Sequence, residues 1–204
     1  MNKLISDKKG FFIPINKFTI AIFIFIFVIY LAYTYLPGEE AEYKNSTVHN
    51  IGRELGFTAP DSKLIEQEIF KIVNRERANN NKFSLDLDYE LASLARDHSK
   101  DMKLRDFYEH TNPDGDDPTD RAEKKGINTV NGNYIGIAEN IAIIYVNNDA
   151  DCQTHDENEL GVCLMNKWMH SPGHRANILD GYYDSIGIGV YCDAEQCWAT
   201  QDFR

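Results

Sequence analysis

The 204-residue chain has few basic residues and none of the common signatures of a hydrolase. It lacks the His-Glu-x-x-His motif of zinc peptidases, the Gly-x-Ser-x-Gly turn of serine hydrolases and a lone cysteine that could serve as a nucleophile. Acidic residues outnumber basic ones by 32 to 21. This excess argues against a nucleic-acid partner and against electrostatic docking on anionic lipid.

Charge is also missing from residues 18–36, a stretch of nineteen residues flanked by Lys17 and Glu39. As a helix it is about 28 Å long at 1.5 Å per residue, which matches the hydrocarbon core of a bilayer. Lysines precede it and glutamates follow it, so residues 1–17 are predicted to be cytoplasmic and the rest extracellular. A cleaved signal peptide is the alternative, but its apolar region is usually shorter and ends at a small-residue cleavage site. We therefore expect a retained single-pass anchor in the cell membrane.

No cysteine occurs before residue 150, and the four that follow form two close pairs, Cys152 with Cys163 and Cys192 with Cys197. An even number in an exported domain indicates disulfides, with three possible pairings. Pairing of near neighbours is favoured because the residues around the second pair have the pattern of a β-hairpin. A zinc site is the alternative, but the spacings are not Cys-x2-Cys.

Residues 37–61 are polar, contain Gly and Pro, and are predicted to be a linker. Residues 62–204 have the size of one domain, without an internal repeat. Hydrophobic periodicity, capping residues and breakers predict an α+β fold whose helices precede a terminal antiparallel hairpin. The expected helices are 62–78, 88–105, 118–125 and 157–169, and the hairpin strands are 186–192 and 197–203.

Three segments carry candidate site residues. Ser171 to Arg175 reads Ser-Pro-Gly-His-Arg, which ends one helix and presents His174 at the start of the next element. Residues 106–113 contain His110, and residues 136–142 contain the sequence Ala-Glu-Asn-Ile. His98 lies on an apolar helix face and is predicted to be a packed core histidine.

Together with Asn112-Pro-Asp-Gly and Arg121, these segments resemble the CAP family, which comprises cysteine-rich secretory proteins, antigen 5 and pathogenesis-related class 1 proteins and is also called the SCP domain. The similarity is greatest to its short prokaryotic members and covers nearly the whole outer domain. The resemblance implies a three-layer α-β-α sandwich with a central antiparallel sheet and a groove at its edge.

The family's groove holds two histidines and two glutamates, which bind a divalent metal in some members. Carried over, these are His110, His174 and Glu139, a set whose donor types suit zinc. The second glutamate is replaced by Ser171, with His170 one residue before it, so the set is incomplete. Asn140 and Glu139 could instead brace loops, and Arg175 could hold its turn. The candidate groove residues are His110, Glu139, Asn140, His170, His174 and Arg175.

Three functions fit the sequence. The first is a non-enzymatic, membrane-anchored extracellular module whose groove binds a small ligand, lipid, peptide or metal. The second is a metal-dependent hydrolase, a peptidase, with Glu139 as general base. The third is a purely structural or adhesion domain. Whether the chain is an enzyme is left open by the residues, because the fold alone does not determine function.

Overall fold

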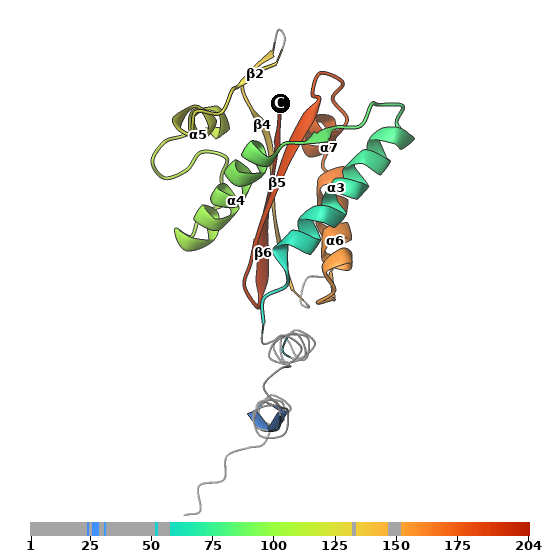
Figure 1. Cartoon of the computed structure of the whole chain (residues 1–204), viewed down its shortest axis with the longest axis vertical. Helices are drawn as coiled ribbons and strands as arrows, with labels where there is room; N and C mark the ends of the chain where they lie inside the picture. Colours follow the sequence, from blue (N-terminus) through green and yellow to red (C-terminus); the bar gives the residue numbers. More distant parts are fainter. Residues whose placement is uncertain are drawn as a thin grey trace, which may run out of the picture. The chain divides into compact units, whose positions relative to one another are not determined.

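Figure 1 shows the computed structural model of the chain, which describes residues 58–131, 134–146 and 152–204 together with Ile24, residues 26–28, Leu31 and Gly52. The chain divides into two compact units, Met1–Leu55 and Gly56–Arg204. No helix within the described residues is long and apolar enough to cross a membrane. The membrane helix predicted for residues 18–36 lies outside the described residues except for five of its positions.

The second unit is an α+β domain with helices on both sides of a sheet (Figure 1). Helices α4 and α5 cover one face, and α3, α6 and α7 cover the other. This arrangement matches the expected three layers. In chain order the elements are α3 (Ser62–Asn79), β1 (Asp86–Leu87), α4 (Tyr89–Leu104), α5 (Pro118–Lys124), β2 (Val130–Asn131), β3 (Tyr134–Ile135), β4 (Ala138–Tyr145), α6 (Glu157–His170), α7 (Pro172–Ile178), β5 (Ser185–Cys192) and β6 (Gln196–Phe203).

The main sheet has the strand order β1-β5-β6-β4. Strands β4, β5 and β6 are antiparallel, as expected, whereas the short β1 pairs with β5 in parallel. The sheet is therefore mixed rather than wholly antiparallel. Sequence periodicity could not predict β1, because a two-residue strand is too short to show an alternation.

The helices begin and end close to the predicted positions because their caps are strong. Asp61 accepts a hydrogen bond from the amide of Lys63 at the start of α3, and Asp88 accepts from the amides of Glu90 and Leu91 at the start of α4. The predicted apolar face of α3 is buried in the main core. Its residues are Ile65, Ile69, Ile72 and Val73.

Two glycines let α4 lie directly on β5. A Cβ atom at Gly187 would be 2.1 Å from the carbonyl carbon of Leu91, and one at Gly189 would be 2.0 Å from the amide nitrogen of Arg96. Any side chain at these positions would therefore push the helix off the sheet. The close approach brings α4 against β5 and β6, and α4 carries His98.

Both predicted disulfides are present. Cys152 and Cys163 join the segment before α6 to the helix itself, with a Cα–Cα distance of 5.7 Å. Cys192 and Cys197 close the β5–β6 hairpin, with a Cα–Cα distance of 4.1 Å. The preference for near-neighbour pairing is thereby confirmed, and the zinc alternative for the cysteines is excluded by this pairing.

Candidate functional site

The centre of the candidate site is a hydrogen bond between His110 and Glu139. His110 follows α4 in a loop, Glu139 lies on β4, and His110 Nδ1 is 2.8 Å from Glu139 Oε1. A carboxylate only accepts hydrogen bonds, so the proton lies on Nδ1 and the Nε2 atom is left for other partners. The Glu139 side chain is 1% exposed and that of His110 is 51% exposed. A buried carboxylate thus orients a half-exposed imidazole.

Arg121 of α5 fixes the other oxygen of the carboxylate. Its Nη2 atom donates to Glu139 Oε2 at 2.5 Å, and its Nη1 atom donates to the carbonyl of His110 at 2.6 Å. One guanidinium therefore holds both members of the pair. Charge-assisted contacts of this kind are the stronger class of hydrogen bond.

The pKa values of the two histidines near Glu139, His110 and His98, are shifted in opposite directions. The pKa of His110 is raised, mainly by its hydrogen bond to Glu139. The pKa of His98 is lowered, mainly by burial, although its Nε2 atom is 3.8 Å from Glu139 Oε1. Burial lowers the pKa of His98 by more than the charge of Glu139 raises it. His98 is therefore a neutral imidazole and does not form an ion pair with Glu139. Its Nε2 donates to the carbonyl of Glu109 at 3.1 Å, which supports the predicted core role.

Asp202 of β6 lies beneath this network and is fully buried. Among the described residues neither of its oxygens accepts a hydrogen bond. Its pKa is raised well above the usual range, first by burial and then by the negative charge of Glu139. A protonated carboxyl group can donate to a carboxylate, which makes Glu139 the natural partner for that proton.

Asn140 ties α7 to the sheet. Its Nδ2 atom donates to the carbonyl of His174 at 3.1 Å and to Gln201 Oε1 at 3.0 Å. Its Oδ1 atom accepts from Asn177 Nδ2 at 2.9 Å. The bracing alternative for Asn140 is therefore the one that the contacts support. They fix the start of α7, which carries His174.

His174 belongs electrostatically to the same cluster. Its pKa is lowered, first by burial and then by the nearby His110. The structure thus brings together four of the six predicted residues. They are His110, Glu139, Asn140 and His174.

The other two predicted residues lie elsewhere. His170 and Arg175 line a separate cavity of about 660 Å³. His170 Nδ1 donates to the carbonyl of Asn166 at 2.7 Å, and Arg175 Nη2 donates to Asn80 Oδ1 at 3.2 Å. Within the described residues neither forms a hydrogen bond or ion pair with the His110 cluster.

The three-ligand metal set is only partly assembled. Both oxygens of Glu139 and the Nδ1 atom of His110 already have partners. In the described part of the chain, no group of three or more His, Cys, Asp or Glu residues is placed to hold a metal ion. The donors that remain are His110 Nε2 and an imidazole nitrogen of His174. Glu139 would then not bind the metal itself but would orient His110 through the hydrogen bond to its Nδ1 atom.

Arg121 and Asp202 were missed as site residues by sequence reasoning, although Arg121 matched a family pattern. For Asp202 a signal did exist. Thr200, Gln201 and Asp202 form a run of three polar residues in a terminal strand, and the structure buries all three. Such a run inside a predicted core strand indicates an internal polar network, because buried polar groups need partners.

The sequence and the fold together identify the protein family of this chain. Residues 70–203 match the CAP family, described as the Cysteine-rich secretory protein family. The chain belongs to this family.

Two curated relatives come from Bacillus subtilis. The Uncharacterized protein YkwD is 30% identical over 145 residues, which are 71% of this chain and 49% of YkwD. The Uncharacterized membrane protein YlbC is 27% identical over 138 residues, which are 68% of this chain and 34% of YlbC. This chain therefore spans about half of one relative and a third of the other.

Two solved structures are similar to this domain in fold. The crystal structure of an extracellular protein containing a SCP domain, from Bacillus anthracis, has a TM-score of 0.56 and 30% identity, over 70% of this chain and 40% of that one. An outer surface protein from Borrelia burgdorferi has a TM-score of 0.54 and 17% identity, over 72% of this chain and 96% of that one. The second likeness concerns the fold alone.

Proposed function

We propose that this protein is a membrane-anchored, extracellular CAP-domain module that binds a ligand at the His110 cluster without catalysing a reaction. The observation that carries the proposal is the His110–Glu139 contact. A buried carboxylate and Arg121 hold one edge of the imidazole, and about half of the His110 side chain is exposed. A group held in this way is oriented in advance for a ligand, which lowers the entropic cost of binding.

The ligand class that fits this geometry is a hydrogen-bonding small molecule or peptide, or a divalent metal such as zinc. His110 and His174 would hold the metal, and Glu139 would orient His110. Two imidazoles are fewer ligands than the three or four protein ligands of usual zinc sites, so binding should be weak. When bound, the metal would supply a Lewis acid at the His110 cluster.

The uncharged residues 18–36 and the positive charge before them support the membrane anchor. The name of YlbC includes the words membrane protein, and that of the Bacillus anthracis neighbour includes extracellular. Fractionation of cells that express the full chain tests the anchor. The protein should stay with membranes after a high-salt wash and should be released when residues 18–36 are deleted.

Calorimetric titration of the full chain in detergent with zinc and then with peptides tests the site. His110→Ala/His174→Ala should abolish the binding that the wild type shows. His155→Ala is the matched control, because His155 lies before α6 and forms no hydrogen bond to the cluster. Unchanged binding in the double variant would remove the cluster from the proposed site.

A hydrolase is the second candidate, favoured by one observation. A carboxylate hydrogen-bonded to a histidine is the arrangement that orients a general base in many enzymes. Incubation of the full chain with a peptide library, with and without zinc, tests this candidate. Cleavage that disappears in Glu139→Gln would support it.

A further inference from the structure

A cavity of about 660 Å³ lies where α6 and α7 meet the segment that follows α3. Its ionisable lining residues are all basic. They are Lys82, His170 and Arg175. The remaining lining is apolar and consists of Met169, Pro172, Ala176 and Leu179. The volume is that of an ordinary ligand site.

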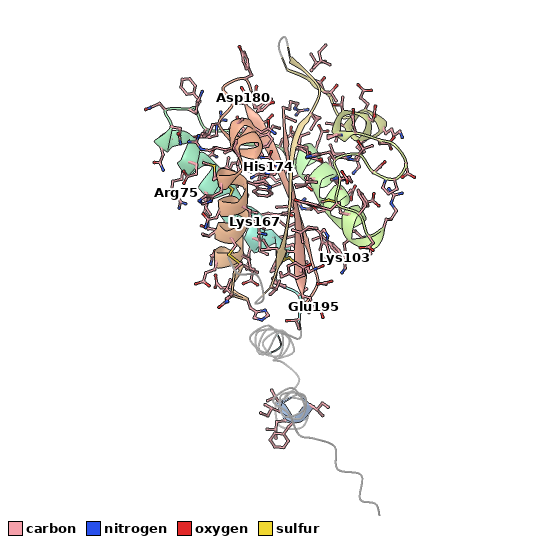
Figure 2. The ribbon with its side chains drawn as sticks, turned by 180° about the vertical axis from the view of Figure 1, so that it is seen from behind. Arg75, Lys103, Lys167, His174, Asp180 and Glu195 are labelled. Carbon is pink, nitrogen blue, oxygen red and sulfur yellow. A yellow bond between two sulfur atoms is a disulfide. The ribbon has the colours of Figure 1, made fainter. Side chains whose placement is uncertain are left out.

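A second cavity of about 350 Å³ adjoins the first through His170. It is lined by Cys163, Asn166, Lys167 and His170, which recur on one face of α6. The seven residue-to-residue steps from Cys163 to His170 correspond to about 10 Å of helix. We call Lys82, Lys167, His170 and Arg175 the basic track. Figure 2 shows Lys167 and His174 on the side of the sheet opposite Lys103.

The lining of the basic track differs in charge from the outer part of the chain as a whole. Residues 37–204 carry 17 basic and 31 acidic residues, a net charge of −14. Yet among the described residues neither of the two cavities is lined by Asp or Glu. At physiological ionic strength charges act over about 8 Å, so the local lining dominates the distant acidic surface.

A cavity of about 430 Å³ between α3 and α4 provides the contrast. It is also lined by basic residues, including Lys71 and Arg96, but Glu66 lies among them. Arg96 Nη2 is 2.6 Å from Glu66 Oε2, and Lys71 Nζ is 3.0 Å from Glu68 Oε2. Two of its three cations therefore pair with carboxylates of the protein, and one of these carboxylates, Glu66, lines the cavity itself.

The walls of the basic track are fixed by a buried cation. Arg77 is 1% exposed and donates to the carbonyls of Phe83 at 2.7 Å, Ile178 at 2.8 Å and Asp180 at 2.8 Å. These contacts hold the residue after Lys82 against the end of α7. The carboxylate of Asp180 is the acidic group that interacts with Arg77, and it also accepts from the amide of Tyr182.

We propose that the basic track binds an extended anion that carries several phosphate or carboxylate groups along a chain. Four basic side chains in two adjoining cavities suit repeated charges better than one isolated charge. Arg175 also offers a planar fork that matches either group. The apolar lining can contact the uncharged parts of the same chain. The site is separate from the His110 cluster, so the proposal goes beyond the proposed function.

Titration of the full chain in detergent with tripolyphosphate and with tetraglutamate tests the proposal. We expect saturable binding of at least one probe, weakened at least tenfold by Lys82→Gln/Arg175→Gln and weakened further as salt is raised. The matched control is Lys100→Gln/Lys103→Gln, which removes the same charge from α4 and should leave binding unchanged. Melting curves of both variants establish that they are folded.

The two probes separate the possible sources. Binding of tripolyphosphate alone would assign a phosphate chain, and binding of tetraglutamate alone a carboxylate chain. Binding of neither probe, or equal loss in both double variants, would overturn the proposal. Binding to duplex DNA in preference to both probes would also overturn it, because the ligand would then be a nucleic acid.

Discussion

Asp202 on β6 stands directly opposite Glu139 on β4, so two carboxyl groups meet in the interior below His110. Within the described residues Arg121 donates to Glu139 and His110 contacts it, whereas neither oxygen of Asp202 has a hydrogen-bond partner. The pKa of Asp202 is raised by burial and by that neighbour. Burial beside Glu139 therefore favours the protonated form of Asp202.

The first prediction concerns Asp202→Asn and the pH dependence of stability. A pKa that is raised in the folded state contributes to the free energy of unfolding. This contribution is complete below the pKa of the unfolded chain, near 4, and is lost as pH rises from there through the pKa of the folded protein. Each unit of pKa difference corresponds to about 1.4 kcal/mol. The variant should lose this dependence and be at least as stable as the wild type at pH 7.

Urea unfolding at pH values from 4 to 8 measures this effect. Asp106→Asn is the matched control, because Asp106 is exposed and has a positive φ of 55° that Asn also tolerates. A variant that is less stable than the wild type by the same amount at every pH would contradict a neutral Asp202.

The second prediction is that Glu139→Gln lowers both stability and the pKa of His110. Glu139 is the main cause of the raised pKa of His110, so its removal should return that pKa towards about 6.5. The change also leaves buried Arg121 without its carboxylate, and breaking such a pair costs about 3–5 kcal/mol.

NMR titration of the His110 imidazole and denaturant unfolding provide the two measurements. Glu123→Gln, on the exposed side of α5, is the control. The raised pKa of His110 stabilises the folded protein below about pH 6.5, and this stabilisation is lost as pH rises through the folded pKa. The free energies of unfolding of the wild type and the variant should therefore differ less at alkaline pH. A His110 pKa that does not move would refute the orienting role of Glu139.

The third prediction is that Asn140→Ala loosens α7. The side chain is fully buried and makes three hydrogen bonds, each of which contributes about 1 kcal/mol. We expect a loss of about 2–3 kcal/mol and faster hydrogen exchange in residues 172–178. Asn158→Ala, at an exposed position of α6, should leave both unchanged. Unaltered exchange in α7 would show that Asn140 does not fasten it.

The fourth prediction ranks the two disulfides. The Cys152–Cys163 bridge closes a separation of 11 residues, and the Cys192–Cys197 bridge one of 5. In the chain-entropy model the longer loop gives the larger stabilisation, about 3 kcal/mol for a loop of 15 residues. Replacement of the first pair by serine should therefore lower Tm more than replacement of the second. The opposite ranking would mean that hairpin geometry outweighs loop entropy.

Much of the domain was predictable because its signals are local. The apolar face of α3, the caps Asp61 and Asp88, and the terminal hairpin lie in the sequence where the structure has them. Helix α7 was expected only as an unspecified short element, since Pro and Gly near its start mark a boundary without specifying the type of the next element. Strands β1, β2 and β3 have two residues each and leave no periodic pattern.

The candidate site was predictable only in part, because its contacts are long-range. The family motifs identified His110, Glu139 and His174, but motif order does not show that His170 and Arg175 belong to another cavity. Asp202 meets Glu139 only through the β4–β6 register. That register is set by strand pairing between segments some 60 residues apart, which no single segment encodes.

The buried guanidinium of Arg77 also constrains how the chain folds. Its acceptors at Ile178, Asp180 and Tyr183 lie 101, 103 and 106 residues further along the chain. Contacts between such distant residues form slowly, because a long loop must close before they contribute. A chain that ends before residue 178 lacks three of the four carbonyls that accept hydrogen bonds from Arg77 and keeps only that of Phe83. Unfinished chains should therefore keep this end of the domain open to proteolysis until the C-terminal hairpin is complete.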